Sequence, residues 1–209
     1  MSDSHWVAIE HEAPAAVQRL GTPFEISAKG ISFRSFFSAL ERLRGDEIVT
    51  RTIEQLSDDL QEAVMLGRIA ANEWRSIAWL RELHRAARRV TGESAVLCRA
   101  LGYEGVRLDF NGPLRALAFT LSPQAMLRRG PRIFRTYYRP GEMYVLDAGP
   151  GRLRMHWSGC AGFDANLWNA TLGGCEAVLK VCGARAVDLS VLSGAGEHDS
   201  RAEIIARWV

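Results

Sequence analysis

The last third of the chain, residues 144–208, shows the clearest alternation of apolar and polar positions. Residues 144–157 form two strand-like runs joined by the turn Gly149-Pro150-Gly151, and further runs follow at 187–191 and 202–208. In the last three runs every second residue is apolar, a period typical of strands that bury one face. The alternating residues are Leu153, Met155 and Trp157, then Val187, Leu189 and Val191, then Ala202, Ile204, Ala206 and Trp208.

Between the second and third of these runs, residues 164–182 repeat apolar side chains at helical spacing. The stripe consists of Leu167, Thr171, Cys175, Val178 and Cys182, with Trp168, Leu172 and Leu179 beside it. Four antiparallel strands with one apolar face need a cover, so we expect this helix to lie on the sheet. Gly173 and Gly174 interrupt the helix, and each costs about 1 kcal/mol relative to alanine. We expect a close approach of another backbone there; the alternative is space for a ligand.

The first two thirds of the chain predict mainly helices. Apolar residues at helical spacing, bounded by glycine or by capping residues, mark helices at 31–44, 46–56, 57–66, 72–90, 94–101 and 113–130. The basic and aromatic residues 132–140 are expected to lead into the first strand of the sheet. The predicted fold class is therefore α+β, with an N-terminal helical layer followed by a C-terminal ββαββ antiparallel sheet unit. A chain of 209 residues can bury one sizeable core. We predict a flexible tail over 1–24 and a single domain over 25–209.

Composition narrows the functional classes only slightly. The chain is 47% hydrophobic and 24% charged, as is ordinary for a globular protein. No apolar run approaches the length of about 20 residues that spans a bilayer, and the first residues do not resemble a signal peptide. A cytoplasmic protein is therefore expected. The net charge of +2 does not by itself indicate nucleic acid, although residues 110–141 contain six arginines and no acidic residue.

The four cysteines are Cys98, Cys160, Cys175 and Cys182, and none form a Cys-x-x-Cys pair. Buried thiols in a reducing compartment are the simplest interpretation. Cys175 and Cys182 share a helix face but lie about 10 Å apart along it, too far for one zinc ion. No metal site is predicted. Cys160 lies in a glycine-rich turn with His156 four residues earlier, so a reactive thiol there is one alternative.

Several short motifs together resemble an uncharacterised family of about 200 residues, close to the 209 of this chain, known mainly from myxobacteria. The resemblance extends over about residues 29–208. Its motifs are Lys29-Gly30 with Phe33, Gly45-Asp46-Glu47, Pro131-Arg132-Ile133-Phe134-Arg135-Thr136, Gly149-Pro150-Gly151, Gly183-Ala184-Arg185 and Arg207-Trp208.

The fold that this resemblance implies is similar to the ligand-binding domain of haem–nitric-oxide sensors, four-vinyl-reductase-type sensor domains and vesicle-tethering subunits. Members of that wider group bind haem, acyl chains or other small apolar ligands between helices and sheet, or act as dimeric interaction modules. The tyrosine-x-serine-x-arginine motif of the haem sensors is absent, and the nearest run is 137–141. His84 and His156 are each interpreted as ordinary boundary histidines, so no cofactor is predicted.

These considerations predict a non-enzymatic regulatory or sensor-like module that forms a homodimer and binds a small apolar ligand or a protein partner. The ligand is expected between the helical layer and the sheet, against Trp74, Trp79, Phe119, Trp157 and Trp168, with Arg132 and Arg135 at the rim. The main alternative is a binder of an anionic nucleotide or nucleic acid. Its contacts would come from Arg128, Arg129, Arg132, Arg135 and Arg139. A third hypothesis is an enzyme that uses the Cys160 thiol. The Gly-x-Ser-x-Gly, phosphate-loop and dinucleotide motifs, which would indicate other kinds of enzyme, are all absent.

Overall fold

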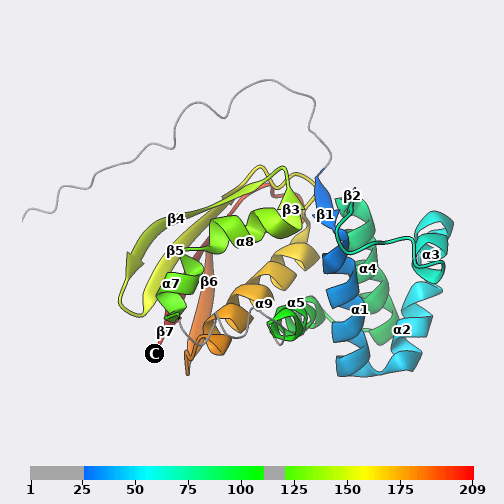
Figure 1. Cartoon of the computed structure of the whole chain (residues 1–209), viewed down its shortest axis with the longest axis horizontal. Coiled ribbons are helices and arrows are strands. Elements are labelled where there is room, and N and C mark those ends of the chain that lie inside the picture. The colour runs from blue at the N-terminus through cyan, green and yellow to red at the C-terminus, as the bar shows by residue number, and fades with distance from the viewer. Residues whose placement is uncertain (1–25, 111–120) are drawn as a thin grey trace, which may run out of the picture.

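The structure, a computed structural model, describes residues 26–110 and 121–209. Its first half contains β1 (Ser27–Lys29), α1 (Gly30–Arg44), α2 (Asp46–Ile53), α3 (Asp58–Met65), β2 (Trp74–Ser76), α4 (Ile77–Thr91) and α5 (Val96–Asp109). The second half contains α7 (Pro123–Leu127), α8 (Gly130–Tyr137), β3 (Tyr138–Arg139), β4 (Glu142–Gly149), β5 (Arg152–Ser158), α9 (Ala165–Val181), β6 (Val187–Gly194) and β7 (Ala202–Trp208). Figure 1 shows α1–α4 gathered at one end and the large sheet at the other. The predicted α+β class is confirmed.

The C-terminal sheet has the predicted ββαββ order. Its four antiparallel strands are arranged β4-β5-β7-β6. Within it Met155 pairs with Ile204 and Leu153 pairs with Ala206, and all four side chains are fully buried. Their neighbours along each strand point the other way, so one face of the sheet is apolar. That face is covered by α9, α7 and α8 (Figure 1).

The cover helix α9 also crosses α5, and this is the most extensive helix–helix contact in the described residues. The two backbones come close because each helix places a glycine against the backbone of the other. A Cβ atom at Gly102 would lie 2.7 Å from the Cα of Ala170, and one at Gly173 would lie 2.8 Å from the backbone nitrogen of Tyr103. Alanine would fit at neither position without a backbone shift. The close approach expected at Gly173 is therefore present, and its partner is α5.

The helix α5 is longer than the sequence pattern predicts. It continues through Gly102 and Gly105 to Asp109, whereas glycines were expected to end it near residue 101. Packing against α1 and α9 outweighs the low helix propensity of the two glycines.

The prediction for the segment before the first strand of the large sheet is also wrong. Residues 130–137 form the helix α8 rather than an extended approach to β4. Pro131 lies in the first turn, where its missing N–H is no loss, so Gly130-Pro131 begins a helix instead of stopping one. Phe134 is then buried, while Arg132 and Arg135 on the opposite face are exposed.

A second, three-stranded sheet of order β2-β1-β3 was not foreseen. Its strands have two or three residues each, too few to show a period of two. This sheet changes the start of the fourth helix, because the sequence pattern predicted that the helix begins at Asn72. Residues 74–76 instead form β2, and the side chain of Ser76 caps α4 by accepting a hydrogen bond of 3.1 Å from the backbone N–H of Ala78.

The remaining expectations concern residues that lie partly outside those described. The tail over 1–24 lies wholly outside, as do residues 113–120 of the helix expected at 113–130; in the described part of that segment, residues 123–127 form α7. Within the described ranges, buried apolar residues from Ile26 to Ala206 form one continuous cluster. None of the helices described in these ranges is long and apolar enough to cross a membrane.

Replacing Gly102 by alanine should destabilise the protein. The new methyl group would collide with the backbone of α9 at Ala170, so we expect Gly102→Ala to lower the free energy of unfolding by about 1–3 kcal/mol. Gly105→Ala is the matched control on the same helix, because its Cβ would lie 3.4 Å from the side chain of Ser35, an ordinary contact. The control should be neutral or gain up to about 1 kcal/mol from helix propensity. Urea unfolding of the variants measures both effects, and equal stabilities would contradict the packing described here.

Candidate functional site

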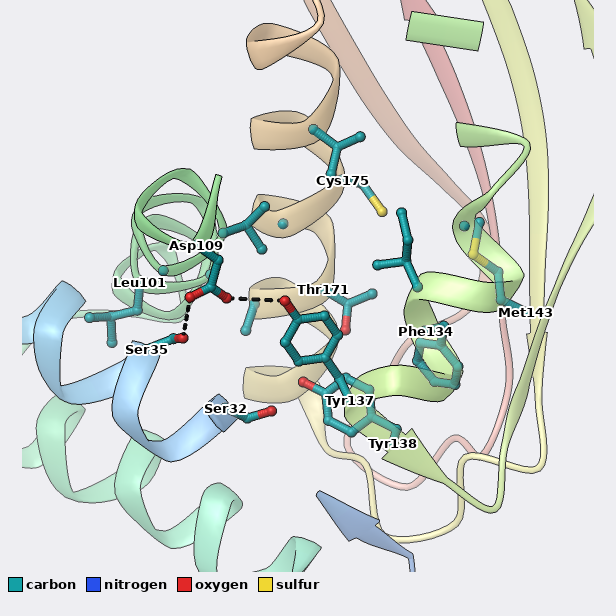
Figure 2. A pocket seen from close by; sticks show the side chains of 18 of the residues that line it. Ser32, Ser35, Leu101, Asp109, Phe134, Tyr137, Tyr138, Met143, Thr171 and Cys175 are labelled. Atoms are coloured by element: carbon teal, nitrogen blue, oxygen red, sulfur yellow. Dashed lines mark hydrogen bonds between the residues drawn. The ribbon is translucent and has the colours of Figure 1, made fainter. Parts of the chain in front are cut away.

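A pocket of about 170 Å³ lies between the two layers of the molecule. It is bounded by α1, α4, α5 and α9 on one side and by α7, α8, β4 and β5 on the other. Figure 2 shows Cys175 on α9 and Met143 on β4 pointing into it from different sides. Most of the wall is apolar, including Leu101, Val106 and Phe134. We call it the central pocket.

Small residues at the α5–α9 crossing create part of this space. Gly102, Gly105, Ala170 and Gly174 all line the central pocket. Their side chains are a hydrogen or a methyl group, so the wall there consists largely of helix backbone. The alternative reading of the Gly173-Gly174 pair, space for a ligand, thus applies to Gly174, while Gly173 makes the close contact.

One corner of the central pocket is polar. The hydroxyl of Ser35 donates a 2.9 Å hydrogen bond to one carboxylate oxygen of Asp109, and the hydroxyl of Tyr137 donates a 3.1 Å bond to the other (Figure 2). Burial raises the pKa of Asp109, and these two hydrogen bonds oppose the shift. Burial and the nearby carboxylate raise the pKa of Tyr137 above its usual range, so its hydroxyl remains a donor. Both oxygens of Asp109 therefore already have a protein partner.

Three other polar atoms in the wall have no such partner. Ser32 Oγ, His84 Nδ1 and Trp157 Nε1 are buried, and none has a hydrogen-bond partner among the described protein atoms. All three residues line the central pocket. The Ser32 hydroxyl lies near that of Tyr138 (Figure 2). Burial raises the pKa of Tyr138 to about 12, against a smaller opposing effect of Ser32.

His84 is held as a neutral imidazole. It is 4% exposed, and its ring packs edge-on against Phe36 with 4.9 Å between ring centroids. Burial lowers its pKa to about 3. In that state one ring nitrogen can donate a hydrogen bond and the other can accept one.

Of the five residues expected to contact a ligand, Trp157 lines the central pocket. Trp168 is fully buried but points elsewhere, because its ring packs against Phe163 and its Nε1 donates a hydrogen bond of 3.1 Å to the carbonyl of Asp199. Trp74 in β2 stacks under the guanidinium of Arg139, at 4.0 Å from the ring centroid. Trp79 lies beside Arg75, and neither Trp74 nor Trp79 lines the pocket. Phe119 lies outside the described residues.

The arginines proposed to bind an anion are exposed and lie on or next to α7 and α8. They are Arg128, Arg129, Arg132, Arg135 and Arg139. Among the residues described, none of the five takes part in an ion pair, and none lines the central pocket. Arg139 lies in β3 rather than on one of these helices, and its guanidinium stacks on Trp74. Their binding of a nucleotide or nucleic acid stays a prediction.

The environment of Cys160 opposes the thiol chemistry considered for it. Its side chain is buried, and its Sγ donates a 3.6 Å hydrogen bond to the carbonyl of Ser158. Burial raises its pKa to about 12, whereas a reactive cysteine needs a lowered pKa. Cys175, in the wall of the central pocket, also has a pKa raised by burial to about 12. Within residues 26–110 and 121–209, no three His, Cys, Asp or Glu side chains gather closely enough to hold a metal ion.

The fold resembles that of solved H-NOX structures. An H-NOX protein from K. algicida superposes with a TM-score of 0.66 at 17% identity, over 87% of this chain and 96% of that one. An oxygen-binding H-NOX domain related to soluble guanylate cyclases gives a TM-score of 0.65 at 13% identity, over 86% and 94% of the two chains. A Cs H-NOX protein gives 0.63 at 14% identity, over 86% and 96%. No family model and no curated protein matches this sequence. The chain therefore has an H-NOX-like fold.

Replacing His84 by phenylalanine should make the stability less sensitive to acid. The pKa of His84 is about 3 in the folded protein, against an ordinary value of 6.5. As the pH falls from 6.5 toward 3, the unfolded chain gains a proton that the folded protein does not bind. The wild type should then lose about 1.4 kcal/mol of unfolding free energy per pH unit from this residue. His84→Phe should lack that contribution in urea unfolding measured across this range. His198→Gln, an exposed control, should follow the wild type; an identical acid response of His84→Phe would refute the assignment.

Proposed function

We propose that this chain is a non-enzymatic, sensor-like module that binds one small, uncharged, mainly apolar molecule in the central pocket. The observation that carries the proposal is an apolar space of about 170 Å³ between helices and sheet, with no lysine or arginine among the lining residues that the structure describes. An apolar cavity of about 150 Å³ in another protein holds benzene, which gives the scale of the ligand. The H-NOX-like fold supports a role of this kind by analogy.

The chemistry of the wall favours a neutral ligand over a charged one. A charge moved from water into an apolar site without a partner costs many kcal/mol. The acidic group of the wall, Asp109, already receives two hydrogen bonds. An anion would find no cation in the described lining, and it would lie near a carboxylate.

Haem, which the titles of several H-NOX structures name, does not fit these residues. The described lining offers no arginine or lysine for the two propionates, and it places Asp109 in the wall instead. Its one histidine, His84, is packed edge-on against Phe36. We therefore propose a ligand other than haem.

The position of α8 supports a sensor role. One face of the helix carries Ile133, Phe134 and Tyr137, which line the central pocket. The other face carries exposed Arg132 and Arg135. A ligand that displaces α8 would thereby move a basic surface, which is available to a protein partner. The homodimer and the identity of a partner stay predictions, as does the absence of enzymatic activity.

Filling the central pocket should abolish ligand binding without unfolding the protein. Cys175→Phe projects a ring into the space from α9, and we expect the affinity for toluene, used as a probe, to fall by a factor of about ten or more. Cys182→Phe is the matched control, since Cys182 caps the C-terminus of the same helix and does not line the pocket. Calorimetric titration of both variants and native mass spectrometry of the wild type measure the effect. Equal toluene binding by both variants would contradict the proposed site.

Hemin added to the purified protein should give no histidine-ligated complex. The reason is the poor fit of the described lining, which has no cation for the propionates. The absorption spectrum should stay that of free hemin, and His84→Ala should leave it unchanged. A stoichiometric, shifted Soret band that disappears in His84→Ala would show that haem does bind, and the proposal of a different ligand would then be abandoned.

A further inference from the structure

We propose that the ligand of the central pocket carries a hydrogen-bond-accepting oxygen, and that this oxygen binds the indole N–H of Trp157. This inference rests on the proposed function and specifies the chemical class of its ligand: a neutral apolar molecule with a carbonyl, ether or hydroxyl oxygen. It follows from the unpartnered polar atoms in the pocket wall, considered one at a time.

Trp157 is the strongest of these observations. The side chain is 1% exposed and belongs to β5, where its neighbours across the sheet are Met143 and Ala202. Its Nε1 is buried without a protein partner. An indole nitrogen can only donate a hydrogen bond, so its partner has to be an acceptor. A buried donor left without one costs about 1–3 kcal/mol of stability.

Trp168 shows that a buried tryptophan in this fold does not generally lack a hydrogen-bond partner. It is as fully buried as Trp157, yet its Nε1 donates a hydrogen bond of 3.1 Å to the carbonyl of Asp199. The fold thus provides an acceptor for the tryptophan that faces away from the central pocket. The tryptophan that lines the pocket has none among the described protein atoms.

His84 and Ser32 extend the pattern to other elements of the wall. His84 comes from α4 and Ser32 from α1, and both present a buried polar atom with no partner to the same pocket. A neutral imidazole and a hydroxyl can each donate or accept. They can therefore hold a hydroxyl group or a bound water beside an oxygen that Trp157 fixes.

The same set of atoms disfavours other ligand classes. A pure hydrocarbon would leave all three atoms unpartnered. A carboxylate would lack a cation in the described lining, and an ammonium ion has no lone pair with which to accept the Trp157 hydrogen bond. A neutral oxygen-containing molecule satisfies the Trp157 donor and adds no charge to the pocket.

Two probes of nearly the same shape test the inference. Acetophenone carries a carbonyl oxygen where α-methylstyrene carries a CH₂ group. We expect acetophenone to bind the wild type about ten times more tightly than α-methylstyrene in calorimetric titration. Trp157→Phe, which keeps an aromatic ring but lacks the N–H, should bind both probes equally. Trp79→Phe, a control outside the pocket lining, should keep the preference.

A second measurement needs no variant at Trp157. In nitrogen-15 correlated proton spectra of the wild type, acetophenone should move one indole N–H signal downfield, and α-methylstyrene should not. Equal affinities of the two probes with no indole shift would overturn the oxygen recognition while leaving an apolar pocket in place. Failure of the wild type to bind either probe would overturn both this inference and the proposed function.

Discussion

The close crossing of α5 and α9 is the constraint on which the rest of the structure depends. Gly102 and Gly173 let the two backbones meet, and alanine at either position would require them to separate. Because α9 also lies on the large sheet, the crossing fixes the distance between the helical layer and the sheet (Figure 1). The central pocket opens directly beside it, where Gly105, Ala170 and Gly174 leave the backbone uncovered. The small residues that allow close packing at the crossing thus also leave the space of the central pocket beside it.

The large sheet and its cover helix could be predicted because their periods are strong and local. The errors arose where a residue has two structural meanings. Gly130-Pro131, expected to end a helix, begins one, and Gly102 lies inside a helix because a neighbouring helix needs the space. The strands β1, β2 and β3 were invisible, since two or three residues carry no period and are defined only by their partners.

The candidate site was harder to derive than the fold. Size alone suggested the tryptophans, and of those described only Trp157 lines the pocket, while Trp168 has the same burial and a different surrounding. The polar corner could not be found from the sequence. Asp109 binds side chains 74 and 28 positions away, at Ser35 and Tyr137, and nothing in the local sequence around any of the three indicates the others.

The small sheet β2-β1-β3 joins parts of the chain that line the pocket from different sides. Its middle strand runs into α1, its strand β2 runs into α4, and its strand β3 continues from α8 (Figure 1). Three pocket-lining helices are thereby joined at one end through the backbone hydrogen bonds of this sheet. A ligand that displaced α8 would therefore pull on β1 through β3, and β1 leads directly into α1 at the opposite wall of the pocket.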